Sequence, residues 1–131
     1  TLGGNPGVWA AALAVIDILK TERLAENAAN VGAYLLKRFR ELAETHELIG
    51  DVRGKGMMVG IEFVKDRMTK EPAKKERDAI LDGAFKRGLV LLGAGPCSLR
   101  LAPPLILNRE QADAGLEIFE QTLKEVEKSA R

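Results

Sequence analysis

The chain has 131 residues, which is the usual size of one domain built around one hydrophobic core. Hydrophobic residues make up 46% of the sequence and charged residues 30%, so a core can form without disulfides or metal ions. The net charge of +1 provides neither a basic footprint for nucleic acid nor an acidic tail. A single Cys and a single His exclude an internal disulfide, the usual His and Cys zinc clusters and most His-based catalytic triads.

No stretch approaches the ~18 consecutive apolar residues of a membrane span, and no charged-then-apolar pattern of a signal peptide is present. We therefore expect a soluble, cytoplasmic protein. The chain begins at Thr1 instead of Met, and it begins inside what already resembles a motif. We therefore expect it to be a fragment of a longer protein.

The N-terminal part of the chain predicts two helices. Asn5 can cap the first helix and Pro6 suits its first turn, and the apolar spacing extends this helix to about Lys20. The second helix is predicted to begin near residue 21 or 22 and is strongly one-sided. Its apolar face consists of Leu24, Ala28, Val31, Leu35, Phe39 and Leu42. Each helix needs apolar structure to cover its stripe.

The middle of the chain changes to a strand-like composition. Residues 48–53 and 57–64 predict an antiparallel hairpin around the turn Gly54-Lys55-Gly56. The glycines superficially resemble a dinucleotide-binding loop, but their spacing is wrong and a strand follows them. Such a loop must open a helix instead.

The second half predicts helix, strand, strand, helix. A charged stretch over residues 65–73 leads into a helix over 74–87 that ends at Gly88. Its expected inward-facing residues are Ile80, Leu81, Ala84 and Phe85. A buried strand is predicted over 89–92, a turn over 93–96 and a further strand over 98–101. Asn108 and Gln111 form a capping-box pattern at the start of the last helix.

These elements predict an α+β fold. The order is helix, helix, strand, strand, helix, strand, strand, helix. Short strands paired locally favour a small, mostly antiparallel sheet with helices packed on one face, instead of a wound parallel sheet.

Three segments carry candidate functional residues. The first is a basic cluster that could steer an anionic ligand, and it consists of Lys65, Arg67, Lys70, Lys74, Lys75 and Arg77. Acidic residues are interspersed with these charges, which favours a solvated loop that leads into a helix. The second is Arg100, at the end of a strand and just before the double proline Pro103-Pro104. Strand alternation predicts that Leu99 and Leu101 lie on one face of the sheet and Arg100 on the other. A guanidinium there can grip a carboxylate through two bonds, although spacing alone favours an ordinary surface or ion-paired arginine.

The third segment is the N-terminal run Thr1 to Pro6. A hydroxyl, two glycines and a helix N-terminus together have the ingredients of a phosphate site. Glycine turns also precede helices where no ligand binds.

Five motifs occur in one order along the whole chain. They are T-L-G-G-N-P before an Ala-rich helix, V-R-G-K-G-M-M-V-G-I-E-F, K-D-R-M-T-K-E-P-A, G-L-V-L-L-G and L-R-L-A-P-P-L-I-L-N-R-E-Q. Together they resemble the C-terminal portion of the class III aminotransferases, the pyridoxal-phosphate enzymes typified by 4-aminobutyrate, ornithine and acetylornithine aminotransferases.

The resemblance implies a fold and two site residues. It implies the small C-terminal domain of fold-type I enzymes over residues 21–131, with residues 1–20 forming the linking helix from a missing large cofactor domain. Thr1 matches a residue that contacts the phosphate of pyridoxal 5'-phosphate in the partner subunit, which implies a homodimer or a higher homo-oligomer. Arg100 matches the residue that faces the substrate carboxylate.

The resemblance also implies the reaction of the intact parent. An amino group would pass between an amine or amino acid and a 2-oxo acid. The lysine that forms the internal aldimine lies upstream of the Thr motif in the family, and no lysine here matches it, so this piece alone is expected to be inactive. The alternatives are an amino-acid racemase or aminomutase of the same family, or a free-standing α+β ligand-binding module.

Overall fold

The computed structural model describes residues 3–130, and Thr1, one of the two predicted site residues, lies outside this range. The described chain forms the eight predicted elements in the predicted order. Their bounds are α1 Pro6–Thr21, α2 Leu24–Thr45, β1 Ile49–Lys55, β2 Met58–Phe63, α3 Lys74–Lys86, β3 Leu92–Ala94, β4 Ser98–Leu101 and α4 Arg109–Ala130.

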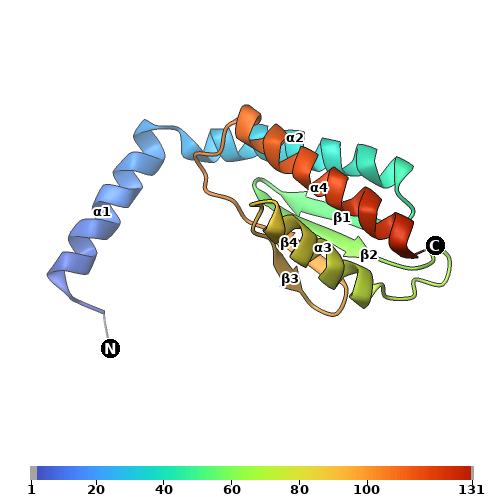
Figure 1. The fold of residues 1–131 in the computed structure, drawn as a ribbon. Coiled ribbons are helices and arrows are strands. Elements are labelled where there is room, and N and C mark those ends of the chain that lie inside the picture. Colours follow the sequence, from blue (N-terminus) through green and yellow to red (C-terminus); the bar gives the residue numbers. More distant parts are fainter. Residues whose placement is uncertain (1–2, 131) are drawn as a thin grey trace.

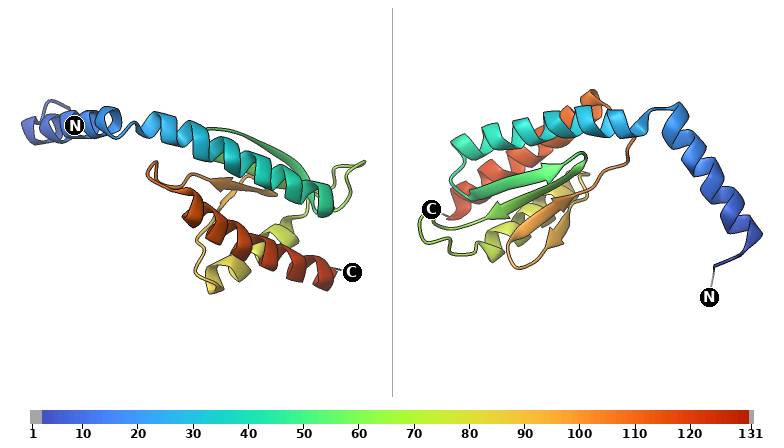
Figure 2. Two further views of the ribbon diagram at one scale, coloured as in Figure 1. Left: turned by 90° about the horizontal axis from the view of Figure 1, so that it is seen from above. Right: turned by 180° about the vertical axis from the view of Figure 1, so that it is seen from behind.

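The four strands form one fully antiparallel sheet in the order β1-β2-β4-β3. Helix α2 lies along β1 and β2, α3 lies along β2 and β3, and α4 packs against both helices on the same side of the sheet (Figures 1 and 2). No helix within residues 3–130 is both long and apolar enough to cross a membrane. The predicted α+β fold with helices on one face is confirmed.

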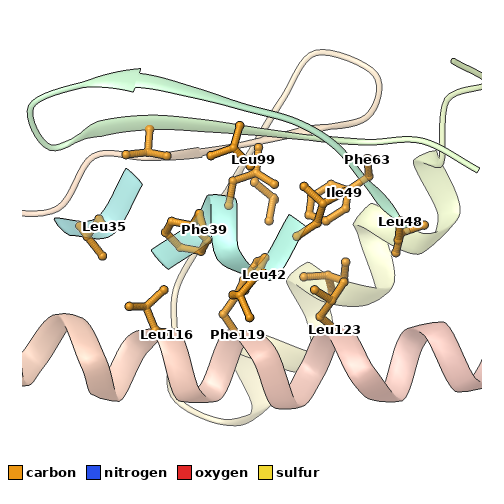
Figure 3. Close-up of a cluster of buried hydrophobic side chains, with 14 of the residues drawn as sticks. Leu35, Phe39, Leu42, Leu48, Ile49, Phe63, Leu99, Leu116, Phe119 and Leu123 are labelled. Atoms are coloured by element: carbon orange, nitrogen blue, oxygen red, sulfur yellow. The ribbon is translucent and has the colours of Figure 1, made fainter. Parts of the chain in front are cut away.

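The core lies between the sheet and the three helices. Alternate residues of β2 point into it, so Val59, Ile61 and Phe63 have no exposed surface. From the opposite side, Leu116, Phe119 and Leu123 of α4 point toward the sheet (Figure 3). The rings of Phe39 and Phe119 meet edge to face, with centroids 5.2 Å apart and planes at 89°. This burial fixes the register of the sheet.

Helix α1 begins as predicted, because the Asn5 side chain caps it. It then extends away from the rest of the described chain, and among the helices and strands it contacts α2 (Figure 2). None of its residues is buried, and Trp9 and Leu13 are 63% and 62% exposed. Its expected apolar stripe is therefore uncovered within residues 3–130. Arg23, in a left-handed conformation with φ 52°, separates α1 from α2.

Two predictions for the third helix and the strand after it are wrong. Phe85 is 67% exposed instead of facing inward. The expected strand at 89–92 is replaced by the short strand β3, in which Leu92 is half exposed. The buried face of α3 consists of Arg77, Ile80 and Ala84, and Phe85 lies one position around the helix from it. The helix ends in a Schellman motif, in which the Leu89 amide donates to Ala84 O and the Gly88 amide donates to Phe85 O, so Leu89 belongs to the helix end. This ending delays the strand, and the following turn shifts to residues 95–97.

The β1–β2 turn also differs slightly from the prediction. Gly54 and Lys55 belong to β1 and pair with Val59 and Met58, so the loop is Gly56-Met57. Gly56 has a φ of +56°, which suits glycine.

The turn backbone lies directly against α2. A Cβ added at Gly32 would lie 2.0 Å from the carbonyl oxygen of Gly56. Helix α2 can therefore approach the hairpin only because residue 32 has no side chain.

Gly32→Ala is expected to lower the free energy of unfolding by about 2–3 kcal/mol, because the hairpin must move away from α2. Gly115→Ala is the matched control in a helix, since its Cβ would meet only Leu89 Cδ1 at 3.7 Å. It is expected to be neutral or stabilising by up to ~1 kcal/mol through helix propensity. Urea unfolding measures both, and equal effects would contradict the close approach.

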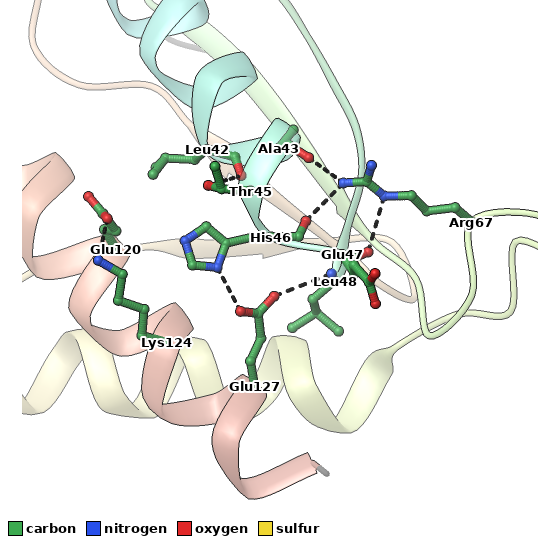
Figure 4. Close-up of polar contacts among 10 residues, drawn as sticks. All are labelled: Leu42, Ala43, Thr45, His46, Glu47, Leu48, Arg67, Glu120, Lys124 and Glu127. Atoms are coloured by element: carbon green, nitrogen blue, oxygen red, sulfur yellow. Dashed lines mark hydrogen bonds and ion pairs between the residues drawn. The ribbon is translucent and has the colours of Figure 1, made fainter.

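A polar cluster joins the end of α2 to the end of α4 (Figure 4). His46 is 5% exposed, and its Nδ1 lies 2.6 Å from Glu127 Oε2. The Leu48 amide donates to the other oxygen of Glu127 at 3.4 Å. On the other side of the turn, Arg67 donates to the carbonyl oxygens of Ala43, His46 and Glu47. These bonds satisfy groups that the end of α2 would otherwise leave unpaired.

Glu127→Ala is expected to destabilise the fold by about 1–3 kcal/mol, because the buried His46 ring and the Leu48 amide lose their partner. Glu117→Ala, at an exposed position of the same helix, is expected to change stability by no more than ~0.5 kcal/mol. Thermal or urea unfolding of the two variants checks the difference. Equal stability would show that water replaces the Glu127 carboxylate without cost.

Candidate functional site

Arg100 occupies an inner strand of the sheet. It pairs with Gly60 of β2 on one side and with Leu92 of β3 on the other. Its neighbour Leu99 is fully buried in the core, so alternation places Arg100 on the sheet face that carries no helix. The side chain is exposed there. The sequence prediction that Leu99 and Arg100 lie on opposite faces is confirmed.

The open face of the sheet holds a second arginine on the far side of Gly60. Gly60 pairs with Arg53 of β1 as well as with Arg100, so a residue without a side chain separates the two arginines. Arg53 Nη1 donates a hydrogen bond to Asp51 Oδ2 and another to Glu62 Oε2, which lies 3.0 Å away. These two carboxylates raise the pKa of Arg53. Its charge is therefore neutralised within the sheet.

Arg100 differs from Arg53 in its partners. Within residues 3–130, no carboxylate lies at ion-pair distance from Arg100. Its side chain borders a hollow of about 650 Å³ on the open face, lined also by Arg53, Gly60 and Ser98. A free guanidinium at a hollow can accept a carboxylate through two parallel hydrogen bonds. Of the two arginines that line this hollow, Arg100 is therefore the one whose charge is available to an added anion.

A second hollow, of about 400 Å³, lies on the helix side between α2, α4 and the segment after β4. Apart from Arg100 and Gln111, its lining is apolar, including Phe39, Pro103 and Phe119. With so few polar groups it offers little to orient a charged substrate.

The chain after Arg100 is held by a contact that the sequence reasoning missed. The Asn27 side chain of α2 donates to Leu105 O at 2.6 Å and to Leu107 O at 3.0 Å. The double proline stiffens the same segment. An Asn at the start of a long amphipathic helix gives no sequence signal of a partner about 80 residues away.

The predicted basic cluster does not form one site. Lys65 pairs with Glu71, which raises the pKa of Lys65, while Arg67 binds the end of α2. Arg77 is 7% exposed and points into the fold, although the sequence favoured a solvated position. Three of the six members of the cluster thus bind different parts of the chain. Among residues 3–130, no group of three His, Cys, Asp or Glu side chains could hold a metal ion.

The described part of the N-terminal motif is the turn before α1. The Asn5 side chain accepts from the Gly7 amide at 2.9 Å and from the Val8 amide at 3.4 Å, so it already uses the helix donors. A Cβ at Gly3 or Gly4 would meet nothing within 4 Å. Residues 3–8 are therefore a capped helix start whose first amides are already bonded, and they do not by themselves form a phosphate site. The role of Thr1 stays a prediction, because Thr1 lies outside the described residues.

Comparisons with known proteins identify the family. The family model described as Aminotransferase class-III matches residues 1–123. The chain is 42% identical over 127 residues to the leucine/methionine racemase of Thermococcus litoralis, covering 97% of this chain and 29% of that protein. It is 41% identical over 129 residues to the mitochondrial alanine–glyoxylate aminotransferase 2 homolog 2 of Arabidopsis thaliana, covering 96% of this chain and 27% of that protein.

A solved structure agrees with these relatives. An amine transaminase from an uncultivated Pseudomonas species, in its PLP-bound internal aldimine form, superposes with a TM-score of 0.83 at 37% identity. The match covers 89% of this chain and 27% of that chain. The chain therefore belongs to the class III aminotransferase family, and it spans less than a third of the length of these proteins.

The comparisons confirm the class III resemblance and support pyridoxal phosphate as the cofactor of the family to which the chain belongs. The comparisons do not identify the substrate subgroup within the family. The relatives include racemases as well as alanine–glyoxylate aminotransferases, so the 4-aminobutyrate or ornithine subgroup stays a prediction.

Proposed function

We propose that this chain is the C-terminal small-domain portion of a pyridoxal-phosphate-dependent aminotransferase. The intact enzyme transfers an amino group from an amine or amino acid, of the 4-aminobutyrate type, to a 2-oxo acid. Residues 1–20 are the link to the large domain and residues 21–131 are the small domain. The cytoplasmic location stays part of this proposal.

The observation that carries the proposal is the unpaired Arg100 on the open sheet face. Both substrates of an amino-acid transaminase carry a carboxylate, and the reaction needs it held in a fixed orientation. A guanidinium on an inner strand supplies that orientation, because the neighbouring strands restrict its backbone. Arg53 cannot do the same, since its Nη1 is already bound to two carboxylates.

Thr1 has the second proposed role. Its hydroxyl is proposed to donate to the cofactor phosphate of the partner subunit, which makes the active enzyme a homodimer or a higher homo-oligomer. When bound, the cofactor supplies the electron sink for the reaction. The lysine that acts as base belongs to the proposed large domain, so the 131-residue chain alone is expected to be inactive.

The reaction itself is tested with the full-length parent. We expect cofactor-dependent amino transfer to pyruvate or 2-oxoglutarate from at least one donor among 4-aminobutyrate, alanine and simple amines. Product formation measured by chromatography is the readout, with the 131-residue chain as the inactive control. Absence of any reaction in the loaded full-length protein would favour a ligand-binding module instead.

A racemase is the second candidate, because a relative at 42% identity is named leucine/methionine racemase. The same preparation distinguishes the two. A racemase inverts L-leucine or L-methionine without an added 2-oxo acid, whereas an aminotransferase stops after one equivalent of amino group has passed to the cofactor. Chiral chromatography gives the answer, and it also detects an aminomutase through a shifted amino group.

Arg100→Ala in the full-length enzyme is expected to weaken binding of carboxylate substrates by about 2–3 kcal/mol, because a bidentate charged contact is lost. Cofactor uptake, read from the absorbance spectrum, should stay unchanged. Arg100→Lys should recover only part of the loss, since a lysine lacks the planar fork. Unchanged KM and kcat/KM for carboxylate substrates would disprove the role of Arg100.

A further inference from the structure

Arg77, in the first turn of α3, is a buried arginine that points away from solvent. It is 7% exposed, and among the described residues only His46 and Thr122 are other buried polar side chains. A buried guanidinium is costly unless its N–H groups are bonded. The hydrogen bonds of Arg77 therefore show which part of the chain this side chain holds in place.

The Arg77 guanidinium bonds the turn between β3 and β4. Nη1 donates to Ser98 O at 3.0 Å and to Gly95 O at 3.3 Å, and Nη2 donates to Pro96 O at 3.3 Å. Nε donates to Asp78 Oδ1 at 2.7 Å. Two carbonyl groups of the turn and the first carbonyl group of β4 thus bind one side chain, which fixes this segment to α3.

The strand beside the guanidinium is shaped to receive it. A Cβ added at Gly93 would lie 2.8 Å from Arg77 Nη1 and 3.4 Å from Cζ. Gly93 does not have a positive φ, so the reason for glycine here is space and not backbone conformation. Arg77 and Gly93 therefore form a matched pair.

The turn that Arg77 holds leads directly into Arg100. Ser98, whose carbonyl Arg77 binds most closely, begins β4 and lies two residues before Arg100. The same turn sets the pairing of Leu92 with Arg100. Strand β3 has only three residues and lies at the sheet edge, so its own ladder holds the hairpin weakly.

We propose that Arg77 is a positioning residue for the substrate carboxylate. By fastening the β3–β4 turn to α3, it holds the strand from which Arg100 presents its guanidinium. It contacts no substrate itself. The inference rests on the proposed role of Arg100, because without a carboxylate at Arg100 the turn would have only a structural purpose.

The test is Arg77→Met in the full-length enzyme. KM for a donor with a carboxylate is expected to rise by roughly tenfold, because the fork at Arg100 loses its orientation. KM for a donor amine without a carboxylate, such as 1-phenylethylamine, and kcat should change less than about twofold. Arg77→Lys is expected to recover part of the loss, since one ammonium replaces only some of the bonds.

Arg87→Met is the matched control, because Arg87 is a second arginine of the same element, at the C-cap of α3. Arg87 binds Glu125 of α4 and Gly83 O, and it has no bond to the β3–β4 turn. Its loss should lower stability without changing KM for carboxylate donors. Gly93→Ala is the second variant, because its Cβ displaces the Arg77 guanidinium while every charge is kept. It replaces Arg77→Met in the test if that variant does not fold.

Amide hydrogen exchange provides a readout that does not depend on activity. Residues 94–100 should lose protection in Arg77→Met and in Gly93→Ala, but not in Arg87→Met. If Arg100→Ala raises KM while both Arg77→Met and Gly93→Ala leave it unchanged, the positioning role is wrong and the proposed function stands. An equal rise for donors with and without a carboxylate would also overturn the positioning role. If Arg100→Ala has no effect, the proposed function of Arg100 fails.

Discussion

The burial of one face of a four-stranded sheet is the constraint on which the rest of this structure depends. Because side chains alternate along a strand, covering one face with α2, α3 and α4 forces every second residue to the other face. Val59, Ile61 and Leu99 form the floor of the core. Arg53, Gly60 and Arg100 necessarily follow on the open side. A slip of one residue in β4 would bury Arg100 and expose Leu99.

The open face of the sheet carries one arginine that is paired with carboxylates and one that is not. Arg53 is neutralised by Asp51 and Glu62, while Arg100 keeps its guanidinium available at a hollow. The fold holds Arg100 from three directions. The sheet restricts its backbone, Asn27 holds the segment that follows it, and Arg77 holds the turn that precedes it. Such support suits the role proposed for Arg100, in which the guanidinium must meet a substrate carboxylate at one angle.

Helix α1 has a different relation to the core. Its apolar residues are exposed, although the helix itself is regular and well capped. Asn5 and Pro6 determine where it begins, which is local chemistry that needs no tertiary partner. This agrees with the proposed role of residues 1–20 as a link to a further domain, in which another surface would cover the stripe.

The sequence by itself determined the kind and order of the elements. Apolar periodicity predicted α2, the Asn108 and Gln111 capping box predicted the start of α4, and Gly88, which has a φ of +86°, marked the end of α3. Alternation put Arg100 opposite Leu99, and the motifs gave the family. These features depend on neighbours within about four residues, so the sequence records them directly.

Only the tertiary structure decided which residues support the site. The packing of α3 buries Arg77, Ile80 and Ala84 and leaves Phe85 exposed, against the prediction, and β3 begins only at the exposed Leu92. Gly32 and Gly93 are explained only by the Gly56 carbonyl and the Arg77 guanidinium that approach them. Arg77 was predicted to be a solvated charge, and the three carbonyl groups that it binds lie 18 to 21 residues away. Contacts between distant segments depend on how the helices lie on the sheet, and no local pattern encodes that.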